Sequence, residues 1–146
     1  MSTARNRQSK YRTALGLARR VPLRWRRRIV VVVGGAAGSI ARLAVTDIIP
    51  LIGGWPFGTL VVNLTGSFAL GWLIVRLTGG ARPLTLTVPL LGVGLLGGFT
   101  TFGTFALELW MLGTAGRWVV AVGYGVVSVV PGLACAVLGA RLGGRA

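Results

Sequence analysis

The amino-acid sequence predicts an all-α membrane protein with four membrane-spanning helices, the third of them broken near the middle of the membrane. Hydrophobic residues make up 53% of the 146-residue chain, which carries only two carboxylates. Four apolar stretches are each long enough to cross about 30 Å of hydrocarbon at about 1.5 Å per helical residue. Glycines and threonines interrupt the third stretch at its centre, where a continuous helix is disfavoured.

The apolar stretches span residues 29–49, 57–77, 83–112 and 118–142. Each is expected to be helical, because lipid offers the backbone no hydrogen-bond partner. Tryptophans lie near the expected helix ends, where indole rings prefer the boundary between lipid and water. Residues that break helices separate the stretches: Pro50, Gly53, Gly54, Pro56, Gly79, Gly80, Pro83, Gly113 and Gly116.

Most of the sixteen basic residues precede the first stretch, so a membrane surface explains the net charge of +14 without a nucleic acid. Residues 1–28 are expected to form a basic, mostly flexible cytoplasmic tail, followed by a four-helix domain over 29–142 and a short tail over 143–146. With the N-terminus inside, Arg117 is the one basic residue expected outside, if Arg42 is set aside because it lies within the first helix. The chain is therefore expected to be a multi-pass protein of the cell membrane with both termini in the cytoplasm.

Few residues are available for catalysis. The chain has no histidine, one cysteine and two acids, Asp47 and Glu108. It cannot by itself supply a zinc cluster, a Ser-His-Asp triad or a carboxylate pair, so we expect no enzyme. The 24 glycines indicate close helix packing, and the pairs Gly34/Gly38 and Gly94/Gly98 have the spacing that lets backbones approach. An oligomer is expected, with a dimer as the simplest case.

Residues 97–105 read Gly-Gly-Phe-Thr-Thr-Phe-Gly-Thr-Phe. A helix that breaks here leaves free carbonyls, which is a recurrent way to build an ion site in a membrane. The alternative is a kinked helix whose threonines bond back to their own turn. The pairs Asn63/Ser67 and Tyr124/Ser128 each share a helix face, and they either join helices or extend a polar track from the threonines.

Three motifs resemble, in order and spacing, the successive signatures of the CrcB/Fluc fluoride channels. They are GGAAGSIAR at 34–42, GTLVVNLTGSF at 58–68 and GGFTTFGTF at 97–105. The likeness covers about residues 28–142. It implies a passive fluoride channel that exports cytoplasmic fluoride and so reduces its toxicity. It also implies two subunits packed antiparallel, two narrow pathways, and a structural sodium ion where the broken third helices meet.

The same motif match assigns residues to both ions. The sodium ion would be held by the backbone carbonyls of Gly97 and Thr100 from both subunits. Fluoride would meet an amide, hydroxyls and the positive edges of two phenylalanine rings, which suit a small, strongly hydrated anion without trapping it. Without this resemblance, simple packing in lipid would be the preferred interpretation of the phenylalanine pair. The pathway residues would be Asn63, Thr101, Phe102, Thr104, Phe105, Tyr124 and Ser128.

Three charged residues have less definite places. Arg42 would line the vestibule of the pathway, or extend to the lipid boundary. Glu108 matches an acidic residue of the family and is expected near the far surface, whereas Asp47 has no assigned role. With no histidine and no carboxylate expected at mid-depth, coupling to protons lacks a carrier, which favours a passive channel over an antiporter.

The sequence departs from the family in two respects. Gly103 stands where the family usually has serine, so one hydroxyl of the track is missing and conduction is expected to be slower. The asymmetric charge is unexpected for a subunit that must insert in both orientations. It indicates either a homodimer in spite of the bias or a heterodimer with an oppositely oriented paralogue; a natural start near Arg28 would soften the bias.

Two other functions remain open at this point. A small multidrug-type exporter has the same size, but it needs a carboxylate within the first helix, where Asp47 lies at the extreme end. A membrane scaffold without transport needs neither a broken helix nor polar faces on three helices.

Overall fold

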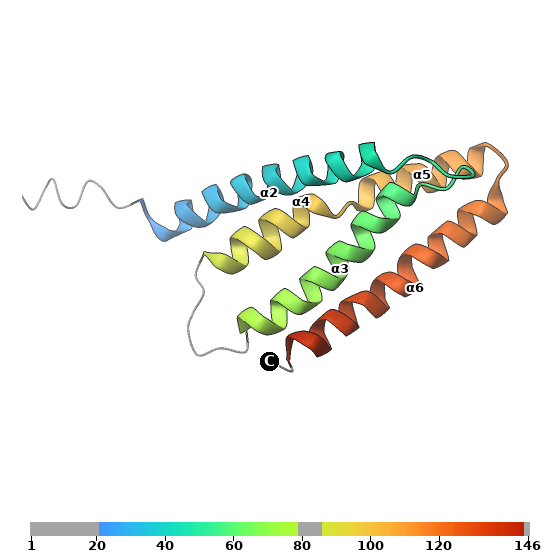
Figure 1. The fold of residues 1–146 in the computed structure, drawn as a ribbon. Coiled ribbons are helices and arrows are strands. Elements are labelled where there is room, and N and C mark those ends of the chain that lie inside the picture. Colours follow the sequence, from blue (N-terminus) through green and yellow to red (C-terminus); the bar gives the residue numbers. More distant parts are fainter. Residues whose placement is uncertain (1–20, 79–85, 145–146) are drawn as a thin grey trace, which may run out of the picture.

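The computed structural model describes residues 21–78 and 86–144. Four helical segments in this part of the chain are long and apolar enough to cross a membrane, which confirms the predicted fold class. The third is interrupted (Figure 1). In chain order the elements are α2 (Leu23–Ile48), α3 (Phe57–Thr78), η1 (Val88–Leu96), α4 (Gly97–Phe99), α5 (Phe102–Thr114) and α6 (Trp118–Gly143).

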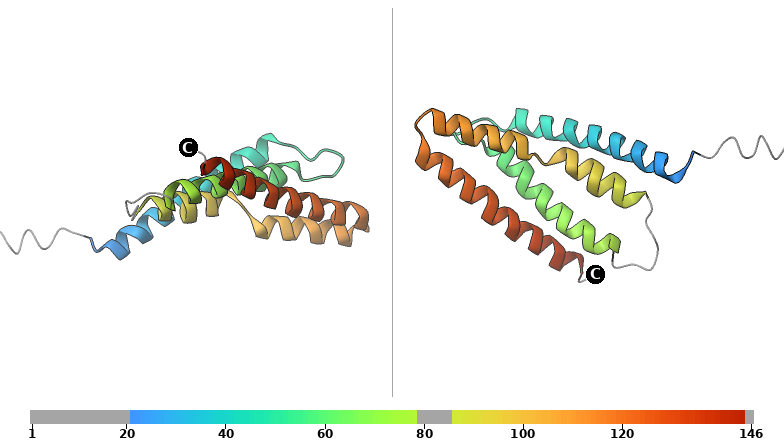
Figure 2. Two further views of the ribbon diagram at one scale, coloured as in Figure 1. Left: turned by 90° about the horizontal axis from the view of Figure 1, so that it is seen from below. Right: turned by 180° about the vertical axis from the view of Figure 1, so that it is seen from behind.

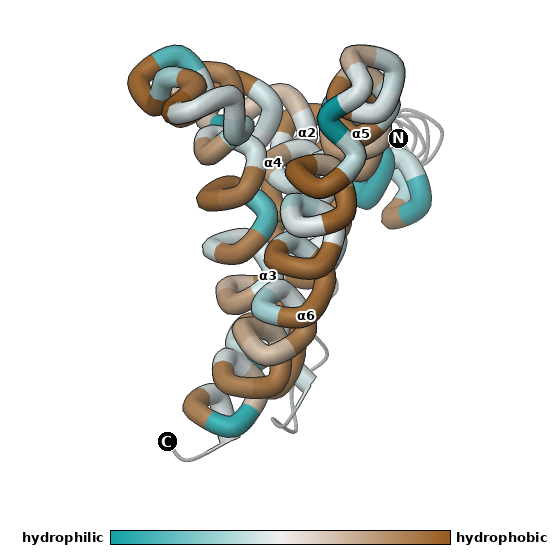
Figure 3. Tube along the Cα trace, turned by 90° about the vertical axis from the view of Figure 1, so that its right-hand side faces the viewer, coloured by the Kyte–Doolittle hydropathy of each residue, from teal (hydrophilic) through white to brown (hydrophobic). Residues whose placement is uncertain are grey.

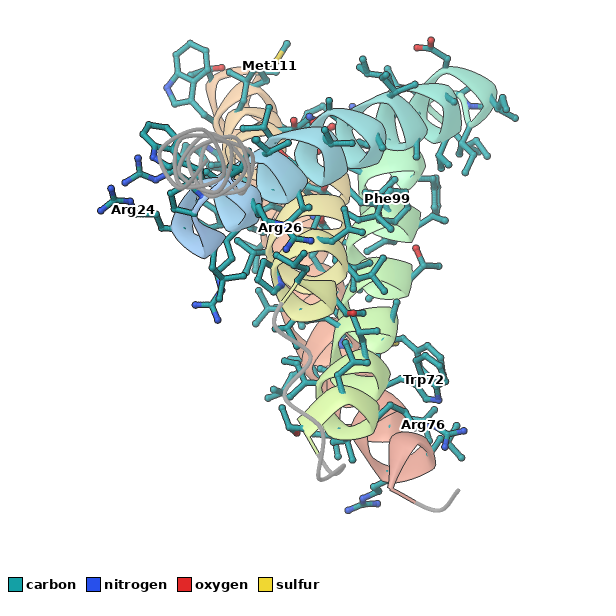
Figure 4. The ribbon with its side chains drawn as sticks, turned by 90° about the vertical axis from the view of Figure 1, so that its left-hand side faces the viewer. Arg24, Arg26, Trp72, Arg76, Phe99 and Met111 are labelled. Carbon is teal, nitrogen blue, oxygen red and sulfur yellow. The ribbon has the colours of Figure 1, made fainter. Side chains whose placement is uncertain are left out.

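Helix α2 begins at Leu23, ahead of the predicted start at residue 29. Pro22 stands directly before it, and no helix breaker separates Leu23 from the apolar stretch, so the helix extends into the basic segment. Arg24 and Arg26 project from these first turns (Figure 4). Of the predicted basic tail, residues 1–20 lie outside the described residues, as do the breakers Gly79, Gly80 and Pro83 and residues 145–146.

Helices α2 and α3 are joined by a tight turn. The amide of Trp55 donates to the Ile52 carbonyl at 3.0 Å, and the amide of Ile52 donates back to Trp55 at 3.4 Å. Gly53 and Gly54, between them, have φ angles of 60° and 80°, which residues with a side chain rarely adopt. The turn therefore depends on these two glycines.

The third span starts as a π-helix, η1, and continues through the short α4. Thr100 and Thr101 then leave the helical conformation, with ψ angles of 157° and 123°, before α5 resumes the span. The predicted break is thus confirmed at the threonine pair. The wider turns of η1 were not predicted, because a π-helix leaves no distinctive residue pattern in an apolar run.

Glycines lie at two close helix contacts, one between α2 and the η1–α4 segment and one between α3 and α6 (Figure 1). The predicted Gly34/Gly38 and Gly94/Gly98 pairs lie in the contact between α2 and the η1–α4 segment, where a Cβ on Gly94 would stand 2.9 Å from the Val31 carbonyl. Helices α3 and α6 pack in the same way through glycines, and Figure 2 shows α5 beside α6. The small residues therefore set both helix contacts.

Polar residues gather mainly toward the ends of the subunit, whereas apolar residues cover most of the length of α3 and α6 (Figure 3). Arg28 lies over the ring of Trp25 at 4.7 Å, and Arg76 lies over that of Trp72 at 5.4 Å. α2 begins and α3 ends at the same end of the bundle, so both Arg–Trp pairs are at this end (Figures 1 and 4). This arrangement is typical of a helix bundle anchored at one membrane boundary.

We predict that Gly38→Ala destabilises the subunit by about 1–3 kcal/mol, the usual cost of overpacking. The added Cβ would overlap the Leu95 carbonyl oxygen and lie 2.8 Å from the Phe99 amide nitrogen. Gly92→Ala is the matched control, since a Cβ there meets no described atom within 4 Å. Thermal unfolding in detergent measures both variants, and equal midpoints would contradict the packing of α2 described above.

Candidate functional site

The break in the third span is held by the side-chain amide of Asn63 on α3. Its Oδ1 accepts a hydrogen bond from the Thr101 amide at 2.8 Å, and its Nδ2 donates to the Thr101 carbonyl at 3.0 Å. Thr100 can approach α3 because Gly66 has no side chain; a Cβ there would overlap the Thr100 methyl group. Asn63 thus replaces the acceptor that the Thr101 amide loses by leaving the helix, and it adds a donor to the Thr101 carbonyl.

The carbonyls of residues 97 to 100 lose their helical partners at this break, and Gly97 and Thr100 are among them. In a continuous helix the amides of Thr101 and Thr104 would donate to the carbonyls of Gly97 and Thr100. Here the Thr101 amide donates to Asn63, and the Thr104 amide donates to the Thr101 hydroxyl at 3.1 Å. The released carbonyls include the two that the sequence singled out, and oxygen donors of this kind suit a hard cation such as sodium.

The threonines also shape the ends of the two half-helices. The Thr101 side chain caps α5, and its hydroxyl lies 3.1 Å from that of Thr104. Thr100 Oγ1 donates to the Leu96 carbonyl at 2.9 Å and closes the preceding turn. The Thr101 hydroxyl, assigned from sequence to the pathway, is therefore already engaged as a helix cap.

A cavity of about 310 Å³ lies beside the break, and we refer to it as the break cavity. Five of the seven predicted pathway residues line it, whereas Thr104 and Tyr124 do not. The Oγ atom of Ser128 is buried there and makes no hydrogen bond within the described residues. The lining residues are Asn63, Ser67, Leu70, Thr100, Thr101, Phe102, Phe105, Ser128 and Val129.

The two phenylalanines differ in their surroundings. Phe102 is 80% exposed in the single subunit, and its ring centroid lies 6.1 Å from that of Phe105. The Phe105 ring lies 5.3 Å from the ring of Tyr124, which is fully buried. The aromatic series therefore leads from an open surface into the bundle.

Glu108, which the sequence interpretation places toward the far surface, is half-buried and makes contacts between helices. Its Oε1 accepts a hydrogen bond from the Thr59 hydroxyl at 2.7 Å, and its Oε2 accepts one from the Tyr124 hydroxyl at 2.6 Å. The face of α5 that carries Glu108 meets α3 and α6, about 9 Å along the axis from the end of α5. Thr59 was missed from sequence, although it extends the polar face of Asn63 and Ser67 by one turn.

The other predicted site residues lie apart from the break cavity. Arg42 on α2 is half-buried, and its Nε makes no hydrogen bond within the described ranges. Gly97 is exposed on the single subunit. Gly103 is open: a Cβ built there meets no described atom within 4 Å.

The chain matches the family described as CrcB-like protein, Camphor Resistance (CrcB), over residues 29–140. It is 45% identical over 92 residues to the Fluoride-specific ion channel FluC of Chloroflexus aurantiacus, which covers 61% of this chain and 71% of that protein. It is 42% identical over 115 residues to the FluC of Paracoccus denitrificans, with 77% and 90% covered. For the Fluoride-specific ion channel FluC 1 of Mycobacterium tuberculosis the identity is 38% over 110 residues, with 75% and 83% covered.

We predict that Asn63→Ala loosens the break without unfolding the subunit. The Thr101 amide would lose its acceptor, so its hydrogen exchange in nanodiscs should be at least about tenfold faster, which corresponds to about 1.4 kcal/mol of lost protection. Thr65→Ala is the control, because Thr65 is exposed and bonds to its own helix. Unchanged exchange at Thr101 would show that Asn63 does not hold the break.

Proposed function

Because the chain belongs to the CrcB-like family, we propose that it is a passive, fluoride-selective channel through which cytoplasmic fluoride leaves the cell, reducing its toxicity. The observation that carries the proposal is the break cavity, which joins an amide, hydroxyls and two phenylalanine rings beside an unwound turn. No reaction is catalysed in this account, and the membrane potential, negative inside, drives the anion outward.

The cavity suits fluoride because its polar groups are neutral. A pathway for a strongly hydrated anion must replace water with hydrogen-bond donors but must not hold the ion so tightly that it cannot leave. Asn63 and the buried Ser128 hydroxyl offer such donors, and neither carries a charge. The edges of Phe102 and Phe105, the positive side of the ring quadrupole, would add a weak attraction.

The pathway is completed by the predicted residues that line no part of the cavity. Thr104 lies next to the break cavity, because its hydroxyl is hydrogen-bonded to that of Thr101, which lines the cavity. Tyr124 continues the pathway along α6, with its ring against Phe105. Arg42 serves as the vestibule residue, where a half-buried cation draws anions in.

A structural sodium ion would be held by the released carbonyls of Gly97 and Thr100. The fit is supported by the hydrogen bonds of Thr101 and Thr104, whose amides donate elsewhere. Sodium would supply a fixed positive charge that keeps the unwound turns together. Two carbonyls from one chain are too few for such an ion, so the same pair from a second subunit would complete the set.

We therefore propose an antiparallel dimer in which two third helices meet at their breaks. The exposed Gly97 and Phe102 support this, since they leave the broken segment open on one side of the single subunit. Both termini of this chain face the cytoplasm, as the described arginines at the start of α2 and the end of α3 favour. The charge bias further favours a heterodimer with an oppositely oriented paralogue over a homodimer.

Neither alternative function gains support from the structure. A multidrug-type exporter would need a carboxylate inside the first helix, but Asp47 is exposed one residue from the end of α2. Glu108 is the one acid inside the described bundle, and both of its oxygens accept hydrogen bonds from hydroxyl groups. Such a carboxylate is held as a fixed acceptor, which favours passive conduction over exchange for protons.

We predict that liposomes holding the purified chain, alone or with the paralogue, release fluoride in the absence of a proton gradient. Phe105→Leu should slow this efflux at least about tenfold while the assembly is retained, equivalent to about 1.4 kcal/mol. Trp110→Leu is the matched control on α5, because Trp110 is 65% exposed and lines no part of the break cavity. A fluoride electrode and size-exclusion chromatography measure the two properties.

The outcomes separate the possibilities. Efflux from the chain alone identifies a homodimer, and efflux only with the paralogue identifies a heterodimer. A scaffold would give no efflux in either case and would tolerate Phe105→Leu.

We predict that Gly103→Ser speeds fluoride efflux by restoring a hydroxyl at a position that is open within the subunit. Gly103→Ala is the control, because it adds a side chain and raises helix preference by about 1 kcal/mol without the hydroxyl. Efflux through Gly103→Ser no faster than through Gly103→Ala would show that this hydroxyl has no part in conduction here.

A further inference from the structure

A second cavity, of about 350 Å³, lies at the end of the bundle where α2 turns into α3 and α5 turns into α6. We refer to it as the end cavity. The residues that line it come from the α2–α3 turn, from α5 and from the segment ahead of α6: Leu51, Gly54, Pro56, Glu108, Met111, Leu112, Ala115 and Arg117. Two of these residues are charged, the acid Glu108 and the base Arg117.

A chain of side-chain contacts runs from the break cavity to the end cavity. Phe105 lines the break cavity, and its ring lies 5.3 Å from that of Tyr124. The Tyr124 hydroxyl donates to Glu108 at 2.6 Å, and Glu108 lines the end cavity. The end cavity therefore lies where the aromatic series of the pathway reaches the end of the subunit.

The Arg117 guanidinium is fixed beside this cavity by the α2–α3 turn. Its Nη2 donates to the Gly53 carbonyl at 2.9 Å. The guanidinium lies so close to Gly54 that a Cβ there would overlap it, and Gly54 has a φ of 80° that also favours glycine. The turn thus gives the cation a defined place and leaves it exposed to solvent.

A carboxylate at the end of an anion pathway repels the ion that must pass it. Glu108 accepts hydrogen bonds from Thr59 and Tyr124, so both of its oxygens act as acceptors at this position. A cation across the same cavity offsets that repulsion, and an exposed, hydrated guanidinium does so without trapping the ion. Such an effect is local, because salt screens exposed charges over about 10 Å at 0.1 M.

We propose that the end cavity is a fluoride-binding mouth and that Arg117 is the residue that draws the anion past Glu108. This inference rests on the proposed channel function. It assigns to Arg117 a role in the rate at low fluoride concentration, not in holding the fold, because the charge acts on the anion as it passes Glu108.

The test is fluoride efflux from liposomes holding the conducting assembly, at sub-saturating fluoride, in about 10 mM to about 0.3 M of an impermeant salt. The quantity compared is the ratio of the rates at low and high salt. We expect Arg117→Gln to reduce this ratio at least about threefold relative to the parent, and Arg117→Lys, which keeps the charge, to preserve it. Arg141→Gln, which removes an exposed charge at the other end of α6 and lines neither cavity, should also preserve it.

The outcomes show whether the charge of Arg117 or its hydrogen bond to Gly53 affects fluoride efflux. An equal ratio in Arg117→Gln and the parent overturns the proposal, and so does a loss in Arg117→Lys as large as in Arg117→Gln, since the bond to Gly53 and not the charge would then matter. Arg117→Met takes the place of Arg117→Gln if the latter does not assemble. Absence of fluoride efflux in the parent would instead overturn the channel function itself.

Discussion

The pair of hydrogen bonds between the Asn63 amide and the Thr101 peptide is the interaction on which the site depends. Within a membrane an unpaired peptide group costs several kcal/mol, so a helix can open only where another group takes over its bonds. Asn63 satisfies both the N–H and the C=O of Thr101. The break is therefore a stable, hydrogen-bonded feature of the fold.

The Asn63–Thr101 hydrogen bonds affect the proposed sites of both ions, sodium and fluoride. Because Thr101 is extended, its hydroxyl can cap α5, and the carbonyls of Gly97 and Thr100 are left for a cation. The same unwound turn forms the wall of the break cavity beside Phe102 and Phe105. One face of α3 also links the two functional regions, since Thr59 contacts Glu108 two turns from the Ser67 that lines the cavity.

Much of this architecture could be predicted from the sequence. Apolar length and the Gly-Gly-Phe-Thr-Thr-Phe-Gly-Thr-Phe segment predicted four spans and the broken one, and the glycine pairs predicted close packing by two helix faces, which the structure brings together between α2 and η1–α4. These features depend on composition and spacing along one helix. The early start of α2 was missed because basic residues mark a membrane boundary and not the end of a helix.

The bonding partners of Glu108 and Arg117 could not be predicted, because both depend on contacts between segments distant in sequence. Glu108 is 49 residues from its partner Thr59, and Arg117 is 64 residues from Gly53. Hydropathy assigns a depth to such residues but not a partner. The orphaned Ser128 hydroxyl is also a property of the packed bundle, since its spacing from Tyr124 shows only a shared face.

The most direct test of the account is to measure fluoride efflux through an assembly carrying Asn63→Ala, under conditions where the parent conducts and both remain assembled by size-exclusion chromatography. If the Asn63–Thr101 hydrogen bonds create the pathway, the variant should lose at least about 90% of the parent's fluoride efflux, a tenfold effect or about 1.4 kcal/mol. Efflux at the parent rate from an assembled Asn63→Ala channel would contradict the claim that the amide holding the broken helix open also makes the pathway.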